Sequence, residues 1–155
     1  MAECVILIGL PGAGKTTFYK RYFAGTHRHV SKDLWPNVSR RDARQQQVLQ
    51  DAFSRGESVV VDNTNPTRQD RARLISAAQE HSVRVVGYFF DVTPRDAVAR
   101  NAWRSGKAKV PNVAIFATAK RLERPAPAEG FDQLFDVRLT PERSFTVIER
   151  TSDPV

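Results

Sequence analysis

Near its beginning the chain reads Gly9-Leu10-Pro11-Gly12-Ala13-Gly14-Lys15-Thr16, which matches G-x-x-x-x-G-K-[ST] at every defined position. The apolar run Val5–Ile8 precedes this stretch, and a helical pattern runs from Lys15 to about Phe23. A phosphate-binding loop requires this context, because it joins the end of a buried strand to the first turn of a helix. The stretch therefore predicts a nucleoside triphosphate site and a P-loop NTPase fold.

The residue types of this loop suit the chemistry of a triphosphate. Glycines at positions 9, 12 and 14 let the backbone curl, so that successive N–H groups point at phosphate oxygens. The helix that begins near Lys15 adds the positive end of its dipole. We expect Lys15 to reach the β- and γ-phosphates and the Thr16 hydroxyl to bind Mg²⁺. The predicted cofactors are therefore ATP and Mg²⁺.

Length and composition limit the remaining possibilities. The 155 residues suit one domain, 1–155, and are too few for a (β/α)₈ barrel; 41% hydrophobic residues exclude a disordered chain. The longest apolar stretch, Val85–Phe90, is too short to span a membrane, and the N-terminus lacks a signal-peptide pattern. Cys4 is the only cysteine, which excludes an intramolecular disulfide and a cysteine-based zinc site. We expect a soluble cytoplasmic protein, or a nuclear one in a eukaryote, without membrane contact or structural metal.

The charge balance is strongly basic. Lysine and arginine total 24 against 17 acidic residues, a net charge of +7, and arginine outnumbers lysine 18 to 6. Such a surplus on a small domain favours a polyanionic partner, because basic side chains release counterions from phosphate backbones, and arginine binds phosphate in a bidentate geometry. Nucleic acid and phosphorylated ligands both fit. An arginine-rich composition can also reflect a biased genome.

Strand and helix patterns alternate along the chain, which predicts a three-layer α/β/α sandwich around a short parallel sheet. A small helical lid is expected over about 100–123, and Ser39 is the expected N-cap of the second helix. The expected strands are Val5–Ile8, His29–Ser31, Ser58–Asp62, Val83–Val92 and Leu134–Leu139. The expected helices run from Lys15 to about Phe23, Ser39 to Arg55, Thr67 to His81, Pro94 to about Ser105 and Pro111 to about Glu123.

Two carboxylates follow predicted strands. Asp33 comes just after the second strand, where it would overlook the ligand crevice of a parallel sheet and could take the proton of an attacking hydroxyl. It could equally be a loop or capping residue. Asp62 ends a Val-Val-Val strand, an arrangement typical of a Walker B carboxylate that holds Mg²⁺ or orients the acceptor. The stretch 63–66 that follows is also explained by a turn and an N-cap alone.

Two groups of arginines are candidates for phosphate contact. Arg100 and Arg104 lie one helical turn apart, beside Lys107 and Lys109, and this segment is typical of a lid that closes over the γ-phosphate. The second group is Arg68, Arg71 and Arg73, for which a solvated helix face is nearly as good an explanation.

Taken together, these blocks resemble the 5′-hydroxyl polynucleotide kinase domain of bacteriophage end-healing enzymes and of polynucleotide kinase-phosphatases. The resemblance extends from about Val5 to Leu139. Its blocks are Gly9–Thr17, the strand that ends at Asp33, Val59–Pro66 with Arg71 and Arg73, Arg100–Arg104 with Val110-Pro111, and Glu123–Pro125 through Glu129–Phe131.

The resemblance implies an ATP-dependent kinase of the 5′-OH ends of DNA or RNA. It implies that Asp33 is the general base, with Lys15 and the lid residue Arg104 as the other catalytic groups, and that Thr16 and Asp62 hold the metal. The implied acceptor-binding residues are Asp33, Asp62, Asn63 and Arg71. The implied nucleotide-binding residues are Gly9, Gly12, Ala13, Gly14, Lys15, Thr16, Thr17 and Arg104.

The chain also departs from this family. Lys32 stands where relatives often have arginine, and the segment 34–37 lacks the arginine that the phage relative uses on its acceptor. No Asp-x-Asp-x-Thr phosphatase motif or ligase motif is present, so the resemblance implies a kinase alone. Two alternatives stay open: a P-loop kinase of a small metabolite or nucleotide sugar, as in toxin-type kinases, and an ATP-binding switch without an acceptor. The first would not need the +7 surplus.

Overall fold

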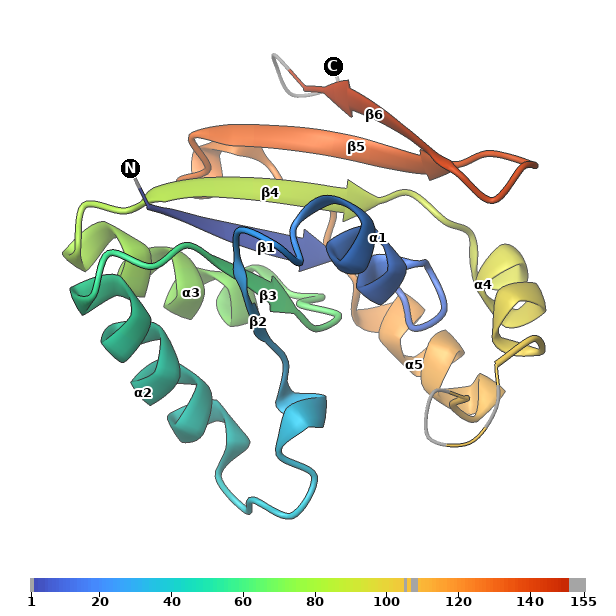
Figure 1. The fold of residues 1–155 in the computed structure, drawn as a ribbon. Coiled ribbons are helices and arrows are strands. Elements are labelled where there is room, and N and C mark those ends of the chain that lie inside the picture. Colours follow the sequence, from blue (N-terminus) through green and yellow to red (C-terminus); the bar gives the residue numbers. More distant parts are fainter. Residues whose placement is uncertain (1, 105, 107–108, 151–155) are drawn as a thin grey trace.

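A computed structural model describes residues 2–104, 106 and 109–150 of the chain (Figure 1). Six strands form one sheet in the order β2-β3-β1-β4-β5-β6; neighbouring strands are parallel, except that β6 runs antiparallel to β5. The strands are β1 (Glu3–Ile8), β2 (Arg28–Val30), β3 (Val59–Asp62), β4 (Arg84–Phe90), β5 (Gln133–Leu139) and β6 (Phe145–Glu149). The α-helices are α1 (Lys15–Tyr22), α2 (Arg41–Ser54), α3 (Arg68–Glu80), α4 (Pro94–Asn101) and α5 (Asn112–Arg121), and the 3₁₀ turns are η1 (Lys32–Leu34) and η3 (Pro127–Glu129).

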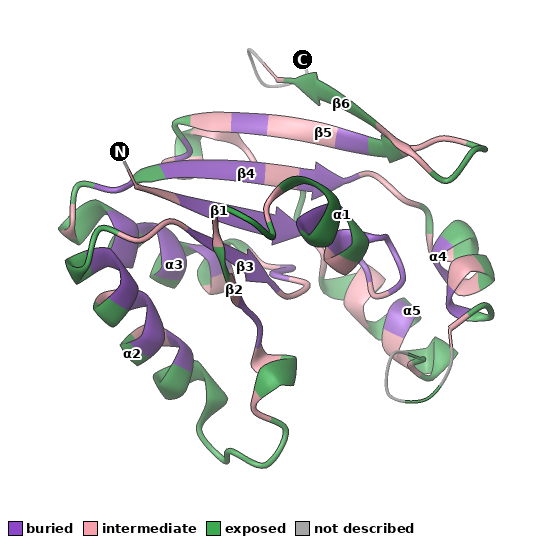
Figure 2. Cartoon of the chain, viewed as in Figure 1, coloured by how far each residue is buried: buried purple, intermediate pink, exposed green. Residues whose placement is uncertain are grey.

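Helices cover both faces of the sheet, because its central strands are apolar on both sides. In β1, Cys4, Ile6 and Ile8 pack in one core with residues of α2 and α3. The alternate residues Val5 and Leu7 pack in a second core with Phe18 of α1, and Phe145 of β6 packs against it. Figure 2 shows these strands buried along most of their length. The predicted three-layer α/β/α sandwich of the P-loop class is confirmed.

The strand order places the ends of three strands at one point. The chain builds β2 and β3 on one side of β1 and then crosses to β4 on the other side. In such a sheet the ligand crevice lies at the carboxyl ends of the strands, where the order reverses. The loop after β1, the turn η1 after β2 and the end of β3 therefore meet at one edge.

Two details differ from the sequence-based expectation. Ser39 does not cap α2: the helix begins after Arg40, which makes no side-chain cap hydrogen bond. The strand β6 was not predicted, because an exposed edge strand shows no continuous apolar run, and Phe145–Glu149 mixes apolar and polar residues. No helix in the described part of the chain is long and apolar enough to cross a membrane.

Candidate active site

A cavity of about 1010 Å³ opens at this edge of the sheet. Its walls come from the phosphate loop, the β2–η1 segment, the end of β3 and the first turns of α2 and α3. The predicted site residues that line it are Gly12, Lys15, Thr16, Asp33, Asp62, Asn63 and Arg104. Five predicted residues do not line it: Gly9, Ala13, Gly14, Thr17 and Arg71. The separate predictions of a phosphate site, two carboxylates and a lid arginine thus refer to one cavity.

The loop between β1 and α1 is shaped by its glycines. Gly12 and Gly14 have φ angles of 83° and 95°, in the region that side chains rarely adopt. A Cβ on Gly12 would lie 2.8 Å from the carbonyl oxygen of Ala97 in α4, so the loop and α4 touch only because this side chain is absent. Arg100, also in α4, donates from Nε to the Gly12 carbonyl at 2.9 Å. Arg100 therefore holds the loop, rather than facing the cavity as a lid arginine would.

The side chain of Lys15 folds back onto the phosphate loop. Its Nζ donates to the carbonyl oxygens of Gly9 at 2.9 Å and Leu10 at 2.7 Å, and its side chain is buried. Burial, with a smaller contribution from the nearby charge of Arg104, lowers the pKa of Lys15 to about 8, although Asp62 and Asp33 oppose the shift. A bound triphosphate would bring negative charge to this ammonium group and raise its pKa again.

This shift predicts that nucleotide binding takes up a proton. At pH 8 about half of the Lys15 side chains are neutral before binding, so about half a proton is taken up as the phosphates recharge the amine. The affinity for ATP should therefore fall as the pH rises through 8. Calorimetry in buffers of different ionisation enthalpy measures the uptake.

Two variants serve as controls for this proton uptake. Lys20→Ala, which changes an exposed lysine of the same helix, should leave it unchanged. Lys15→Arg should abolish it, because the guanidinium stays protonated. A binding enthalpy at pH 8 that is independent of the buffer would contradict the prediction.

Asp62 forms the polar floor of the cavity. Its Oδ2 accepts hydrogen bonds from Thr16 Oγ1 at 2.7 Å and from His29 Nε2 at 2.8 Å, and the side chain is only 5% exposed. Burial would raise the pKa of Asp62, but the hydrogen bonds from His29 and Thr16 and the charge of Lys15 outweigh it and lower the pKa below its usual value. The group is therefore a carboxylate at neutral pH.

The donor set here fits Mg²⁺. This ion prefers oxygen ligands and is commonly held by one or two carboxylates together with substrate phosphates. Thr16 and Asp62 provide a hydroxyl and a carboxylate, in contact with each other and both on the cavity wall beside Lys15. The predicted metal residues are thus adjacent, at the place where the triphosphate is expected.

Asp33 differs from Asp62 in its surroundings. It lies in η1, where its backbone N–H donates to the Ser31 side chain at 3.3 Å, and it is exposed on the cavity wall. In the described part of the chain, no donor binds its carboxylate and no ion pair uses it. A carboxylate of this kind can accept a proton from a ligand in the cavity, which is the capacity that a general base needs.

The residues after Asp62 fix the loops around the site. Asn63 Oδ1 accepts from the backbone N–H of Lys32 at 2.9 Å, which ties η1 to the end of β3. Asn63 Nδ2 donates to Gln45 of α2 at 2.8 Å. Asn65 donates to the Leu7 carbonyl at 2.8 Å, and the Gly9 N–H donates to the Thr64 carbonyl at 3.0 Å. These side chains therefore join β1, β3 and η1 at the cavity.

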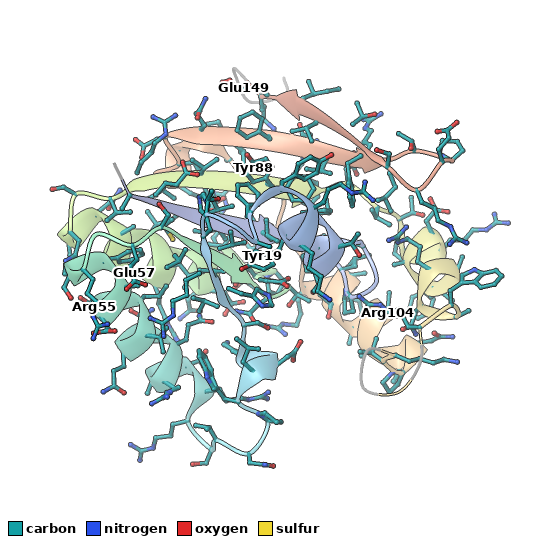
Figure 3. The ribbon with its side chains drawn as sticks, viewed as in Figure 1. Tyr19, Arg55, Glu57, Tyr88, Arg104 and Glu149 are labelled. Carbon is teal, nitrogen blue, oxygen red and sulfur yellow. The ribbon has the colours of Figure 1, made fainter. Side chains whose placement is uncertain are left out.

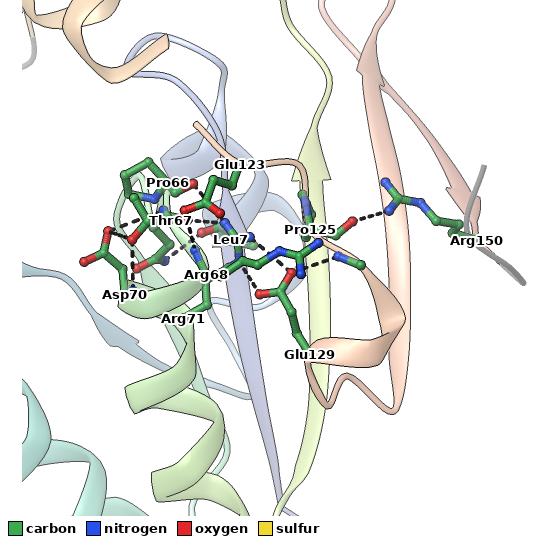
Figure 4. A network of polar contacts seen from close by, with 12 residues as sticks. Leu7, Pro66, Thr67, Arg68, Asp70, Arg71, Glu123, Pro125, Glu129 and Arg150 are labelled. Carbon is green, nitrogen blue, oxygen red and sulfur yellow. Dashed lines mark hydrogen bonds and ion pairs between the residues drawn. The ribbon is translucent and has the colours of Figure 1, made fainter. Parts of the chain in front are cut away.

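The structure corrects the prediction for Arg71. This residue was expected to bind the acceptor, but its side chain is fully buried and does not line the cavity. Its guanidinium forms a bidentate ion pair with Glu129, at 2.8 and 3.1 Å, and donates to the carbonyls of Asn65 and Pro66 (Figure 4). Arg71 therefore binds the loop after β3 to η3, and its buried guanidinium does not face a ligand in the cavity.

Removing this arginine should destabilise the fold strongly. Arg71→Met leaves the Glu129 carboxylate, itself 8% exposed, without its cation, and loss of one partner of a buried pair costs about 3–5 kcal/mol. Urea unfolding should show this decrease in the free energy of unfolding. Arg68→Ala, an exposed arginine one turn earlier, should change it little. Equal unfolding midpoints for the two variants would contradict the assigned role.

Arg104 follows α4 and lines the cavity (Figure 3). Its charge is close enough to Lys15 to influence the pKa of that residue. Lys109 is exposed, and the predicted contribution of Lys107 lies outside the described residues. Of the arginines predicted for the lid, Arg104 is the one in a position to contact a nucleotide at the cavity.

Some cavity residues were not predicted from the sequence. One of them is His29, which donates to Asp62 although the three histidines of the chain show no metal-ligand spacing in the sequence. The parallel pairing of β2 with β3 gives the signal: His29 is opposite Val60, so it faces the same side of the sheet as Asp62 two residues on. Further unpredicted residues on the cavity wall are Arg41, Gln45 and Arg121.

This fold and this loop define a P-loop nucleotide-binding protein of the kinase type. The sequence model of a family described as an AAA domain matches residues 4–125, which include every predicted site residue. The chain therefore belongs to this AAA-domain family.

Two curated relatives are similar over most of the chain. One, from Acanthamoeba polyphaga mimivirus, has a name that proposes a bifunctional polynucleotide phosphatase/kinase; it is 30% identical over 139 residues, which are 85% of this chain and 32% of the relative. The other is the bifunctional polynucleotide phosphatase/kinase of Schizosaccharomyces pombe, 27% identical over 87% of this chain and 33% of the relative. The chain thus spans about a third of the length of these relatives.

Solved structures share the fold at low sequence identity. A fungal RNA kinase matches with a TM-score of 0.67 and 15% identity, over 90% of this chain and 77% of that one. A gluconokinase from Sinorhizobium meliloti matches with a TM-score of 0.62 and 17% identity, over 88% of this chain and 82% of that one. These matches establish the P-loop kinase fold and do not distinguish polynucleotide from small-molecule acceptors.

Proposed function

We propose that this chain is a single kinase domain that transfers the γ-phosphoryl group of ATP to the 5′-OH end of a DNA or RNA strand. The observation that carries the proposal is the position of Asp33: a carboxylate without a hydrogen-bond donor among the described residues, in the same cavity as Lys15, Thr16 and Arg104. The names of the two relatives support a polynucleotide as the acceptor.

The site residues have distinct roles in this reaction. Asp33 accepts the proton of the 5′-hydroxyl as the hydroxyl oxygen bonds to the γ-phosphorus. The bond from that phosphorus to the oxygen that bridges the β- and γ-phosphates breaks, and ADP is released. Lys15 and Arg104 stabilise negative charge on the transferred group. Thr16 and Asp62 would hold Mg²⁺, whose chemistry is to neutralise the phosphate oxygens.

Basic residues on the cavity wall support a strand as the acceptor. Arg41 is the first residue of α2 and Arg73 lies in α3, and both line the cavity. Both side chains are exposed, and neither forms an ion pair with a described residue. An exposed guanidinium that forms no such ion pair can bind an internucleotide phosphate. This arrangement, together with the net charge of +7, favours a polyanionic acceptor over a neutral sugar.

Transfer from γ-labelled ATP with Mg²⁺ to matched oligonucleotides tests the proposal. The strands are DNA and RNA of one sequence, each with a 5′-OH or a 5′-phosphate. We expect label on 5′-OH strands and none on 5′-phosphate strands. The absence of label on every strand, from a protein that still binds ATP, would overturn the proposal and favour a small-molecule kinase.

A further inference from the structure

A histidine that the proposed reaction does not use contacts the carboxylate at the centre of the polar contacts in the site. His29 Nε2 and Thr16 Oγ1 both bond to the same oxygen of Asp62, Oδ2, at 2.8 and 2.7 Å. A carboxylate offers only acceptors, so both of these partners donate. The three side chains form a chain of hydrogen bonds from β2, through the end of β3, to the first turn of α1.

The surroundings of His29 hold its ring in one orientation. Tyr19 of α1 stacks on it with a centroid separation of 4.3 Å and an interplanar angle of 19°. Tyr19 is itself fixed by a hydrogen bond from its hydroxyl to the His27 carbonyl at 2.8 Å. Tyr19 projects from α1 toward the strands (Figure 3). The side chain of His29 is 25% exposed and lines the cavity.

The two oxygens of Asp62 differ, because both hydrogen bonds go to Oδ2. No described side chain donates to Asp62 Oδ1, so this oxygen is the one available to a cation or its water. The hydrogen of the Thr16 hydroxyl points to Oδ2, which leaves the lone pairs of Thr16 Oγ1 for a ligand. Without the His29 contact, Oδ2 would have a single donor and the carboxylate could rotate.

We propose that His29 is a positioning residue of the cation–phosphate site. By fixing Oδ2 of Asp62, it keeps Oδ1 and the Thr16 hydroxyl oxygen turned to the place where a divalent cation meets the phosphates. Partners that orient metal ligands commonly contribute about 10–100-fold to metal affinity. The proposal rests on the nucleotide site of the proposed function and is independent of its acceptor.

His29→Phe tests this role, because it keeps a ring to stack on Tyr19 and removes the donor. The measurement is binding of a fluorescent ATP analogue, titrated with Mg²⁺ and repeated without it. We expect the Mg²⁺ concentration that gives half of the maximal increase in nucleotide affinity to rise by about 10-fold or more. The affinity for the nucleotide without Mg²⁺ should stay close to that of the unaltered protein. His29→Gln, which restores an N–H donor, should recover most of the effect.

A matched control is His27→Phe, since His27 bonds to Glu3 and Thr26 and does not line the cavity. It should leave the Mg²⁺ dependence unchanged. If His29→Phe does not fold, His29→Ala gives the same comparison. An unchanged Mg²⁺ dependence in a folded variant, an equal loss of affinity with and without Mg²⁺, or no recovery with glutamine would each overturn the proposal. Absence of transfer to strands would overturn the proposed acceptor but leave this binding result unaffected.

Discussion

Asp33→Asn should lower the rate of phosphoryl transfer by about 10²–10⁴-fold, the contribution of a single general base. Asparagine has nearly the same shape but cannot take the hydroxyl proton. Because Asp33 is exposed in η1 and no described side chain donates to it, the change should cost little stability. Binding of ATP should be nearly unaffected. The measurements are a single-turnover rate with labelled ATP and the affinity for a fluorescent nucleotide.

Asp42 provides a matched control in the same cavity. Its exposed carboxylate pairs with Lys32 and, like Asp33, lines the wall. Asp42→Asn removes one negative charge from the same region, so it separates the general electrostatic effect from proton transfer. We expect its transfer rate to stay near that of the unaltered protein. A comparable loss in both variants, or a parallel loss of ATP binding in Asp33→Asn, would contradict the assignment of Asp33 as the base.

Arg104→Ala should have an effect at least as large, about 10³–10⁵-fold on the transfer rate, as expected for an arginine that stabilises a transferring phosphoryl group. Arg104 lies on the cavity wall and its charge influences Lys15. Because the stabilised charge develops during transfer, kcat should fall much more than KM for ATP rises. Steady-state kinetics over a range of ATP concentrations separates the two quantities.

Arg95 is the control for this arginine, since it is exposed on α4 and does not line the cavity. Arg95→Ala should leave both kcat and KM nearly unchanged. A variant Arg104→Ala that raises KM alone would show that the residue binds the nucleotide uniformly and does not act on the transferred group.

The sequence was sufficient for those parts of the site that depend on local pattern. The phosphate loop needs only its glycines and the strand and helix beside it. Asp33 and Asp62 could be predicted to be neighbours, because the carboxyl ends of parallel strands meet at one edge of the sheet. The three-layer fold follows in the same way from alternating strand and helix patterns.

Contacts between segments far apart in the sequence could not be predicted from local patterns. The resemblance implied that Arg71 binds the acceptor. Its burial could not be predicted, because its partner Glu129 lies 58 residues along the chain and nothing in the helical pattern indicates the pair. The role of His29 could not be predicted either, since its contact with Asp62 depends on which strands pair and in which register. A long-range pairing must be known before the role of such a polar side chain can be assigned.

The most direct test of the central claim is the position of the transferred phosphate. After reaction of γ-labelled ATP with a 5′-OH oligonucleotide, the product is digested with a nuclease that releases 5′-mononucleotides, and the labelled nucleotide is identified. We predict that all label is in the 5′-phosphate of the strand's first nucleotide. Label at the 3′ end, on internal nucleotides or on the protein, or a strand without label while ATP is bound, would contradict a 5′-hydroxyl kinase.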